Sequence, residues 1–195
     1  MSEKRDSTQA KDRRSERTHQ ALLDAFLSLL FARKYSQIRI SDVIDHAKVA
    51  RSTFYDHFTS KDDILMHSMA GIYATLADIV TKNANPESTT ILLDHLWENR
   101  SLARELMKGP TAAFGPNHGP RHLAQAIEER LKTHYGQTEL EPHVPLSLAA
   151  TLVAAGTMAV LRDWLTGKAA CTSAALAKAL HAGTLAGTAA FISAR

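Results

Sequence analysis

The sequence of 195 residues contains a single cysteine, Cys171, so no disulfide can form within one chain. A lone cysteine is typical of a reducing compartment, and we expect a cytoplasmic protein. Residues 1–20 lack the apolar run of a signal peptide. No uninterrupted apolar run approaches the roughly 20 residues that span a bilayer, so we expect a soluble protein without a membrane partner.

Motifs of enzymes are also missing. The sequence has no nucleophile elbow, no phosphate loop and no dinucleotide-binding fingerprint. Cys171 and a distant histidine could form a nucleophile pair, but a lone cysteine beside alanines is more often structural. We therefore expect no catalysis and no cofactor.

Histidines are numerous, but they do not form a metal-binding pattern. Of the ten, His118 and His122 are four residues apart, yet Pro120 lies between them and disfavours one continuous helix. With only one cysteine, no mixed cysteine and histidine ligand set is available either. We expect no metal site.

Strand-like alternation of polar and apolar residues is absent, whereas apolar residues recur at helical spacing. Hydrophobic residues make up 45% of the chain, enough for a core. Proline and glycine mark breaks, including loops over Gly109–Pro120 and Gly136–Pro145. The sequence predicts an all-α protein, with helices over Ser15–Arg33, Ser41–Ala47, Arg51–Phe58, Lys61–Lys82, Glu87–Lys108, Arg121–Tyr135, Leu146–Leu165 and Thr172–Ser193.

The first predicted helix has a single apolar stripe, which indicates a core helix. Net charge is only +3 and does not by itself identify a nucleic-acid-binding protein. The polar segment before this helix, residues 1–14, is rich in basic residues, and we expect a flexible arm that adds non-specific attraction to phosphates. The stripe consists of Leu22, Leu23, Phe26, Leu27, Leu30 and Phe31.

Two short helices joined by a tight turn follow. Val43, Ile44 and Ala47 share one face of the first helix. Phe54 and Phe58 are four residues apart and predict the buried side of the second. Two helices with a turn of three or four residues form a helix-turn-helix arrangement.

Residues with short polar side chains indicate where the helices begin. Ser41 is our candidate cap for the first helix of the pair. Ser60, followed three residues later by Asp63, predicts a capping box at the start of the long helix.

The segment Arg51–Leu65, RSTFYDHFTSKDDIL, resembles the DNA-binding signature of TetR-type transcriptional regulators. The similarity of motifs covers Arg17–Leu65. It implies a three-helix DNA-binding domain over residues 15–60 and a helical effector-binding and dimerisation domain over 61–195. Two positions depart from the family pattern: Lys48 replaces a common turn glycine, and Arg39 replaces a common capping hydroxyl. At Lys48 we expect modest strain or an altered turn.

The predicted second helix suits the major groove of DNA. Its N-terminal residues meet base edges in helix-turn-helix proteins, and an arginine there can donate two bonds to guanine. The resemblance implies phosphate contacts further along, with support from the next helix and from the start of the first. The predicted DNA-binding residues are Arg39, Ser41, Arg51, Ser52, Thr53, Tyr55, His57 and Lys61.

The last two helices contain stripes of small residues, which allow helix axes to approach closely. Together with the resemblance, they predict a homodimer whose two recognition helices read a near-palindromic operator. The alternative is that both helices merely pack within one subunit. The predicted dimer residues are Leu148, Leu152, Ala155, Ala159, Arg162, Leu176, Ala179, Gly183, Ala186, Gly187 and Ala190.

The resemblance also implies a pocket for an unknown small-molecule effector in the C-terminal domain. Candidate liners are His95, Trp97, Arg100, Met107, Phe114, His122, Met158 and Trp164, although each alone is more often an ordinary core or surface residue. The predicted function is that of a ligand-responsive repressor that binds double-stranded DNA and is released by the effector. The alternative is a helical small-molecule-binding or protein-interaction module, or an activator, without effector-released repression.

Overall fold

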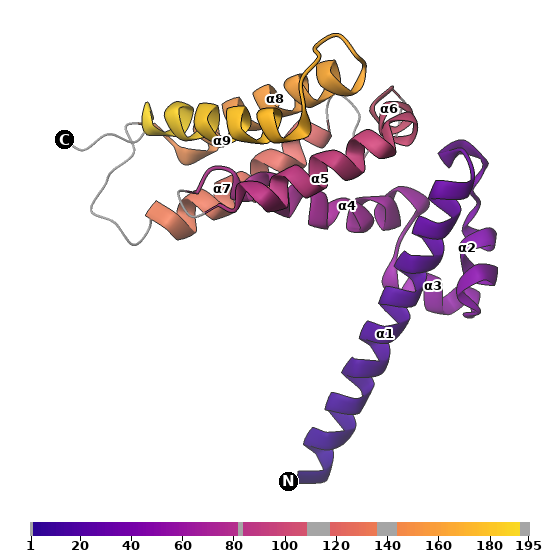
Figure 1. Ribbon diagram of the computed structural model, residues 1–195. Coiled ribbons are helices and arrows are strands. Elements are labelled where there is room, and N and C mark those ends of the chain that lie inside the picture. Colours follow the sequence, from indigo (N-terminus) through magenta and orange to yellow (C-terminus); the bar gives the residue numbers. More distant parts are fainter. Residues whose placement is uncertain (1, 82–83, 109–117, 136–143, 192–195) are drawn as a thin grey trace. The chain divides into compact units, whose positions relative to one another are not determined.

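The computed structural model describes residues 2–81, 84–108, 118–135 and 144–191. Over these ranges the chain forms nine α-helices and one 3-10 helix, and no strand, which confirms the all-α prediction (Figure 1). The chain divides into two compact units, Met1–Ser68 and Met69–Arg195. The predicted loops Gly109–Pro120 and Gly136–Pro145 lie largely outside the described residues.

Helix α1 spans Ser2–Ala32 and therefore includes residues 2–14, where the sequence predicted a flexible arm. No proline or glycine occurs between its ends, so nothing in the chain breaks it. Local side-chain bonds add to its backbone ladder: the Thr18 hydroxyl donates to the Arg14 carbonyl at 3.0 Å, and Gln20 donates to Asp24 at 2.8 Å. In this structure the basic segment is a helical extension.

The buried face of α1 differs from the predicted stripe by part of a turn. Phe31 is 52% exposed, so its predicted place in the core was wrong. Leu29 is buried instead, because it lies three residues after Phe26 on the same face. Leu23 and Leu27 are half-buried at the edge of this face.

The helix-turn-helix pair follows the 3-10 helix η1 (Tyr35–Gln37) and consists of α2 (Ile40–Ala47) and α3 (Arg51–His57). The predicted cap of α2 was wrong. Arg39 is the N-cap residue, and its backbone amide donates to the Asp42 carboxylate at 2.9 Å. Ser41 lies inside the first turn and is exposed, so its hydroxyl is not at the capping position.

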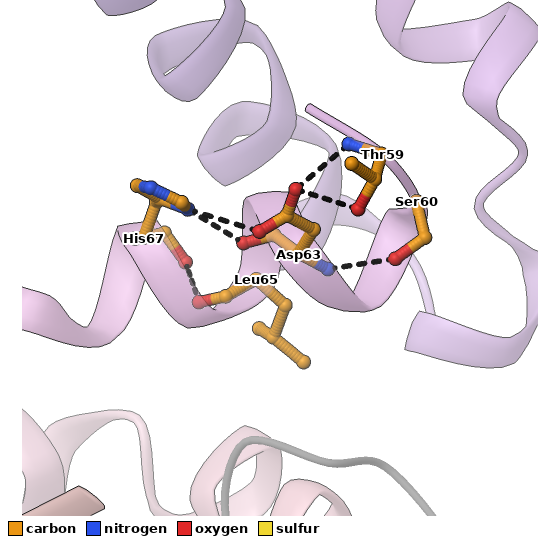
Figure 2. Close-up of polar contacts among 6 residues, drawn as sticks. Thr59, Ser60, Asp63, Leu65 and His67 are labelled. Atoms are coloured by element: carbon orange, nitrogen blue, oxygen red, sulfur yellow. Dashed lines mark hydrogen bonds and ion pairs between the residues drawn. The ribbon is translucent and has the colours of Figure 1, made fainter. Parts of the chain in front are cut away.

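Helix α4 (Lys61–Asp78) begins at the predicted Ser60 cap, but only one of the two bonds of a capping box forms. The Asp63 amide donates to the Ser60 hydroxyl at 3.0 Å (Figure 2). The Asp63 carboxylate accepts bonds from the Thr59 amide at 2.7 Å and the Thr59 hydroxyl at 2.9 Å. Burial opposes ionisation of Asp63, but these two bonds and nearby His67 outweigh it and lower its pKa.

The first compact unit extends to Ser68, inside α4. The reason is that the start of α4 is bonded into this unit. Lys61 donates to the carbonyls of Tyr35 and Ile38, and the ring of His67 lies 5.3 Å from that of Phe58. The first two turns of α4 therefore belong to the helix-turn-helix unit.

The second unit contains the rest of α4 and five further helices: α5 (Pro86–Glu98), α6 (Arg100–Lys108), α7 (Gly119–Tyr135), α8 (Leu146–Leu165) and α9 (Ser173–Ala189). Helix α7 packs against α8, and α5 packs against α9. Helices α7 and α9 are bonded to residues at the end of α4. Arg130 contacts Asp78 at 2.6 Å, and the Thr184 hydroxyl donates to the Ile79 carbonyl at 3.1 Å.

The single helix predicted over Glu87–Lys108 was wrong, because the structure has two helices that meet at Asn99. Asn99 leaves helical geometry with φ −101° and ψ 25°. Its side-chain amide donates to the His95 carbonyl at 2.9 Å and so satisfies an end of α5. An asparagine side chain that bonds to nearby backbone competes with helix continuation in this way. Helix α4 also ends earlier than predicted, at Asp78 rather than Lys82.

Helix α8 has the predicted bounds and the most apolar surface of the second unit. By length and composition it is the one described helix that could cross a membrane, with 39% of its apolar window buried within this fold. Its buried residues, such as Ala150, Leu161 and Trp164, lie on the inner side of the unit. Leu148 and Leu152 are exposed on another side of the same helix.

Candidate nucleic-acid interface

The short helix α3 has one buried side and one exposed side. Phe54 and Phe58 are fully buried, with ring centroids 5.8 Å apart, and anchor the helix in the first unit. Arg51, Ser52 and Tyr55 are exposed. The pairing of buried aromatics with exposed polar groups is confirmed as predicted. The predicted contacts Thr53 and His57 are half-buried at its borders.

Arg51 and Tyr55 lie on the same side of α3, one helical turn apart. The Arg51 guanidinium carbon is 5.7 Å from the centre of the Tyr55 ring, within the range of a cation–π contact. The Tyr55 ring in turn meets Phe54 edge to face at 5.4 Å. Arg51 has no ion pair with a described carboxylate, so its donor groups remain available on the outer surface.

Lys61 has a structural role that the sequence did not reveal. Its ammonium donates to the carbonyls of Tyr35 and Ile38, both at 3.0 Å, and lies 4.1 Å from the Tyr35 ring centre. The Tyr35 hydroxyl donates to the Asp62 carboxylate. Burial first, and then this carboxylate, raise the pKa of Tyr35. Lys61 thus fastens η1 to α4, and its predicted phosphate contact stays a prediction.

Replacing Lys61 with methionine should lower the free energy of unfolding by about 1–3 kcal/mol, because two carbonyls lose a charged donor. Urea unfolding followed by circular dichroism would measure this loss. The matched control is Lys34→Met, since Lys34 is exposed in the same unit and caps nothing with its side chain. Equal stability of the two variants would contradict the structural role of Lys61.

The predicted residues at the start of α2 are also on the surface of the first unit. Arg39 and Ser41 are both exposed and therefore accessible to a phosphate. Nearby, Arg33 and Asp42 approach to 3.8 Å, a surface pair that contributes little to stability. The first unit therefore presents exposed polar groups on both helices of the pair.

Comparison with known proteins agrees with this geometry. Residues 22–67 match the family model described as bacterial regulatory proteins, tetR family. The family match, the curated relatives and the solved structures support a TetR-type transcriptional regulator. The matched range contains η1, α2, α3 and the first turns of α4, which are the elements described above.

Two curated bacterial proteins are similar to this chain in sequence. The uncharacterized HTH-type transcriptional regulator YxbF of Bacillus subtilis (strain 168) is 29% identical over 146 residues, which cover 74% of this chain and 38% of YxbF. The HTH-type dhaKLM operon transcriptional activator DhaS of Lactococcus lactis is 27% identical over 93 residues, 46% of this chain and 48% of DhaS. The matches thus span less than two thirds of these relatives.

Two solved structures share the fold over most of their length. A TetR transcriptional regulator from Streptococcus agalactiae 2603V has a TM-score of 0.54 at 24% identity, covering 91% of this chain and 98% of its own. NalD, the secondary repressor of the MexAB-OprM multidrug efflux pump in Pseudomonas aeruginosa, has a TM-score of 0.52 at 19% identity, covering 89% and 97%. At these identities the likeness concerns the fold alone.

The turn between α2 and α3 contains a residue in the left-handed conformation. Lys48 has φ 55° and ψ 44°, the left-handed conformation, and is the one described non-glycine residue with positive φ. Its amide donates to the Asp45 carbonyl at 3.3 Å, and the next amide, of Val49, donates to Ile44 at 3.2 Å. These bonds satisfy the end of α2 and fix the turn despite the cost of a β-carbon there.

Replacing Lys48 with glycine should raise the free energy of unfolding by about 0.5–1 kcal/mol, because the relief of left-handed strain exceeds the entropy lost by glycine. Lys34→Gly is the matched control. Lys34 has φ −62° and ψ 138°, an ordinary extended conformation, so glycine there should only destabilise. Thermal unfolding of both variants would measure these changes in stability. A loss of stability in both variants would contradict the relief of strain at Lys48.

Three of the predicted effector residues form one cluster in the second unit. The rings of Trp97 and Trp164 are 4.9 Å apart, and the Arg100 guanidinium carbon lies 5.1 Å from the centre of the Trp97 ring. Trp164 is buried, and its indole N–H donates to the Cys171 carbonyl at 3.0 Å. Trp97 is 38% exposed, so it covers Trp164 and offers a partly open aromatic surface.

The remaining predicted effector residues are dispersed. His122 stacks on Tyr73 with centroids 6.2 Å apart. Burial first, and then His118 and Arg121, lower the pKa of His122. Their contact with an effector stays a prediction. Of the others, Met158 is buried, Met107 is half-buried, His95 is exposed, and Phe114 lies outside the described residues.

Five of the predicted dimer residues line an open apolar groove between α8 and α9: Leu152, Leu176, Ala179, Gly183 and Gly187. Leu148 and Leu152 are 54% and 55% exposed. A β-carbon added at Gly156, Gly183 or Gly187 would meet nothing within 4 Å, so packing within the subunit does not require small residues here. Leu176 is buried and lines the groove. The other predicted dimer residues are exposed or half-buried: Ala155, Ala159, Arg162, Ala179, Ala186 and Ala190.

Gly156 and Val160 are among the groove residues that the sequence did not identify, and Val160 is 42% exposed. They follow Leu152 at four-residue steps, so the helical spacing of α8 contained the signal.

Proposed function

We propose that this chain is a cytoplasmic, homodimeric transcriptional repressor that leaves its DNA operator when a small molecule binds the second unit. The observation that supports it most directly is the division of α3 into a buried aromatic side and an exposed side with Arg51, Ser52 and Tyr55. A helix that is held by buried aromatic residues and presents exposed polar side chains can enter the major groove and contact base edges. The match of residues 22–67 to the tetR family model supports the same proposal.

The proposed contacts follow from what the side chains can donate. Arg51 has a planar fork of donors and would bind guanine through O6 and N7. Ser52 and Thr53 would meet neighbouring base edges. Tyr55 and His57 would donate to phosphates and fix the position of the helix along the duplex.

A dimer is supported by the surface of α8 and α9. One short recognition helix reads only a few base pairs, and a two-fold symmetric pair doubles this. The exposed leucines at 148 and 152 and the open glycine positions form a surface on which a second copy could pack closely. An isologous interface uses the same patch on both subunits, which suits two parallel stripes on neighbouring helices.

Release by an effector requires a ligand that binds the DNA-bound and free conformations with different affinity. Candidate contacts are the partly open Trp97 surface with Arg100, and the stack of Tyr73 and His122. The similarity in fold to NalD, a repressor of an efflux pump, supports repression as the first proposal.

The proposal can be tested by selecting duplexes from a random pool with the purified chain and then placing the selected site in a promoter template. Enrichment of a two-fold symmetric motif is expected, together with less transcript when the chain is added. A compound library screened by thermal shift would then supply effectors, and a true effector should restore transcription. The proposal fails if no sequence is enriched.

An activator is the second candidate, because the chain is also similar to DhaS, a transcriptional activator. The same template separates the two, since an activator would raise transcript from the selected site. A helical small-molecule-binding or protein-interaction module would bind compounds in the thermal shift but select no DNA.

A further inference from the structure

Three histidines from three different helices meet around the buried ring of Phe58. His19 of α1 stacks on Phe58, with centroids 4.7 Å apart and planes at 29°. His19 also meets His57 of α3 at 5.6 Å and His67 of α4 at 5.7 Å. We call these three residues the histidine cluster. The cluster lies at the C-terminal end of α3, and one of its members, His57, is a proposed phosphate contact.

The charged groups around His19 come from every helix that packs against it. On its own helix, Glu16 lines the same surface hollow as His19 and His57. On α4, His67 lies 3.3 Å from the Asp63 carboxylate and 3.0 Å from the Asp63 carbonyl (Figure 2). A proton on His67 therefore has a nearby carboxylate, whereas a proton on His19 faces two further imidazoles across an aromatic ring.

The environment of His19 disfavours its charged form. Burial lowers the pKa of His19 most, followed by repulsion from His67 and His57. The folded state therefore binds a proton at His19 less tightly than the unfolded state does. As a result, the free energy of unfolding is not reduced by His19 at pH values above the ordinary histidine pKa of about 6.5. It decreases as pH falls below that value towards the lowered pKa of the folded state.

We propose that His19 is a positioning residue for the DNA-reading helix: while neutral it holds Phe58 and His57 at the end of α3, and when charged it loosens them. The part that concerns DNA rests on the proposed function, since it takes His57 as a phosphate contact. A consequence is that acidification weakens the support of α3 just as it adds positive charge near the phosphates. The two effects can be separated only by variants that keep the ring and remove the charge.

The first test needs no DNA and uses hydrogen exchange of the full chain, measured by mass spectrometry on peptides that contain residues 51–58. Each rate is corrected for intrinsic exchange, and EDTA is present throughout. Between about pH 7.5 and about pH 5.5, protection of α3 in the unsubstituted chain should fall severalfold. His19→Phe keeps an aromatic ring on Phe58 without a titratable group, so its corrected protection should stay constant over the same interval.

Two further variants complete this test. His46→Gln removes an exposed histidine of the same unit outside the cluster and should show the full fall in protection. His19→Gln removes the charge and the stacked ring, so its protection should be low but independent of pH. If His19→Phe loses protection on acidification as strongly as the unsubstituted chain, the proposal is wrong.

The second test measures binding to a duplex selected from the random pool by the unsubstituted chain at about pH 7.5, above the ordinary histidine pKa of about 6.5. His19→Ala should bind severalfold more weakly, and His19→Phe should restore the affinity. Failure of the unsubstituted chain to select any duplex would defeat the proposed function but leave the exchange result to decide the role of His19. Normal binding by His19→Ala, with unchanged protection of α3, would overturn the positioning role.

Discussion

Replacing Leu152 with glutamate should leave each subunit folded and convert the dimer to monomers. Leu152 is 55% exposed in the single subunit, so the new carboxylate would remain in water there. In the proposed dimer the same position is covered, and two-fold symmetry places two such carboxylates in one apolar interface. An unpaired charge buried in this way costs about 3–5 kcal/mol, so dimerisation should weaken at least about a hundredfold.

Analytical ultracentrifugation across a concentration series would measure the loss, and circular dichroism would confirm that the subunit is folded. Ala174→Glu adds the same charge to an exposed position of α9 that lies away from the groove. This control should remain dimeric. Operator affinity should fall with the dimer, because a monomer presents only one recognition helix. A Leu152→Glu chain that sediments as a dimer would remove the α8 and α9 surface from the proposed interface.

Replacing Arg51 with alanine should cost about 1–3 kcal/mol in binding to the selected duplex and relax the preference at one base pair of each half-site. The reason is that Arg51 has available donors on the exposed side of α3 and no described carboxylate partner. Arg51→Lys keeps the charge but loses the planar fork, so it should bind more tightly than alanine without regaining the base preference.

Tyr55→Phe is the contrasting variant. It removes only the hydroxyl and keeps the ring that meets Phe54 and the Arg51 guanidinium. Loss of a phosphate contact should weaken binding to all sequences alike. Binding isotherms for the selected duplex and for duplexes with single base changes would separate the two patterns. If both variants lose discrimination equally, the assignment of base and phosphate contacts is wrong.

The sequence predicted most of the helices because their signals are local. The bounds of α8 and the Ser60 cap of α4 were predicted correctly from a continuous apolar segment and a three-residue spacing. The left-handed turn at Lys48 also followed from one position in the motif. Such features depend on neighbours in the chain, which a single sequence displays.

The errors arose where local signals compete or where partners are distant in the sequence. Ser41 and Arg39 both lie near the start of α2. In the structure Arg39 is the N-cap residue, and its backbone amide donates to the Asp42 carboxylate. Asn99 divided a predicted helix, because its side-chain amide donates to the His95 carbonyl. Lys61 donates to the carbonyls of Tyr35 and Ile38, which precede it by more than twenty residues. No local pattern in the sequence indicates these two hydrogen bonds.

The histidine cluster illustrates the same limit at the candidate site. His57 was predicted from its place in the motif, but His19 and His67 lie on other helices and belong to no shared pattern. Only the packing of α1 and α4 against Phe58 brings the three rings together. A residue that acts by supporting a contact, rather than making one, has no motif of its own.

The central claim is that two copies of α3 enter the major groove at symmetric half-sites. Methylation interference on the selected duplex tests it most directly, because dimethyl sulfate modifies guanine N7 in the major groove and adenine N3 in the minor groove. The account predicts interference at guanines in two symmetric clusters separated by about 10–10.5 base pairs or a multiple of this spacing. Interference confined to adenine N3, or to one side of the site, would contradict it.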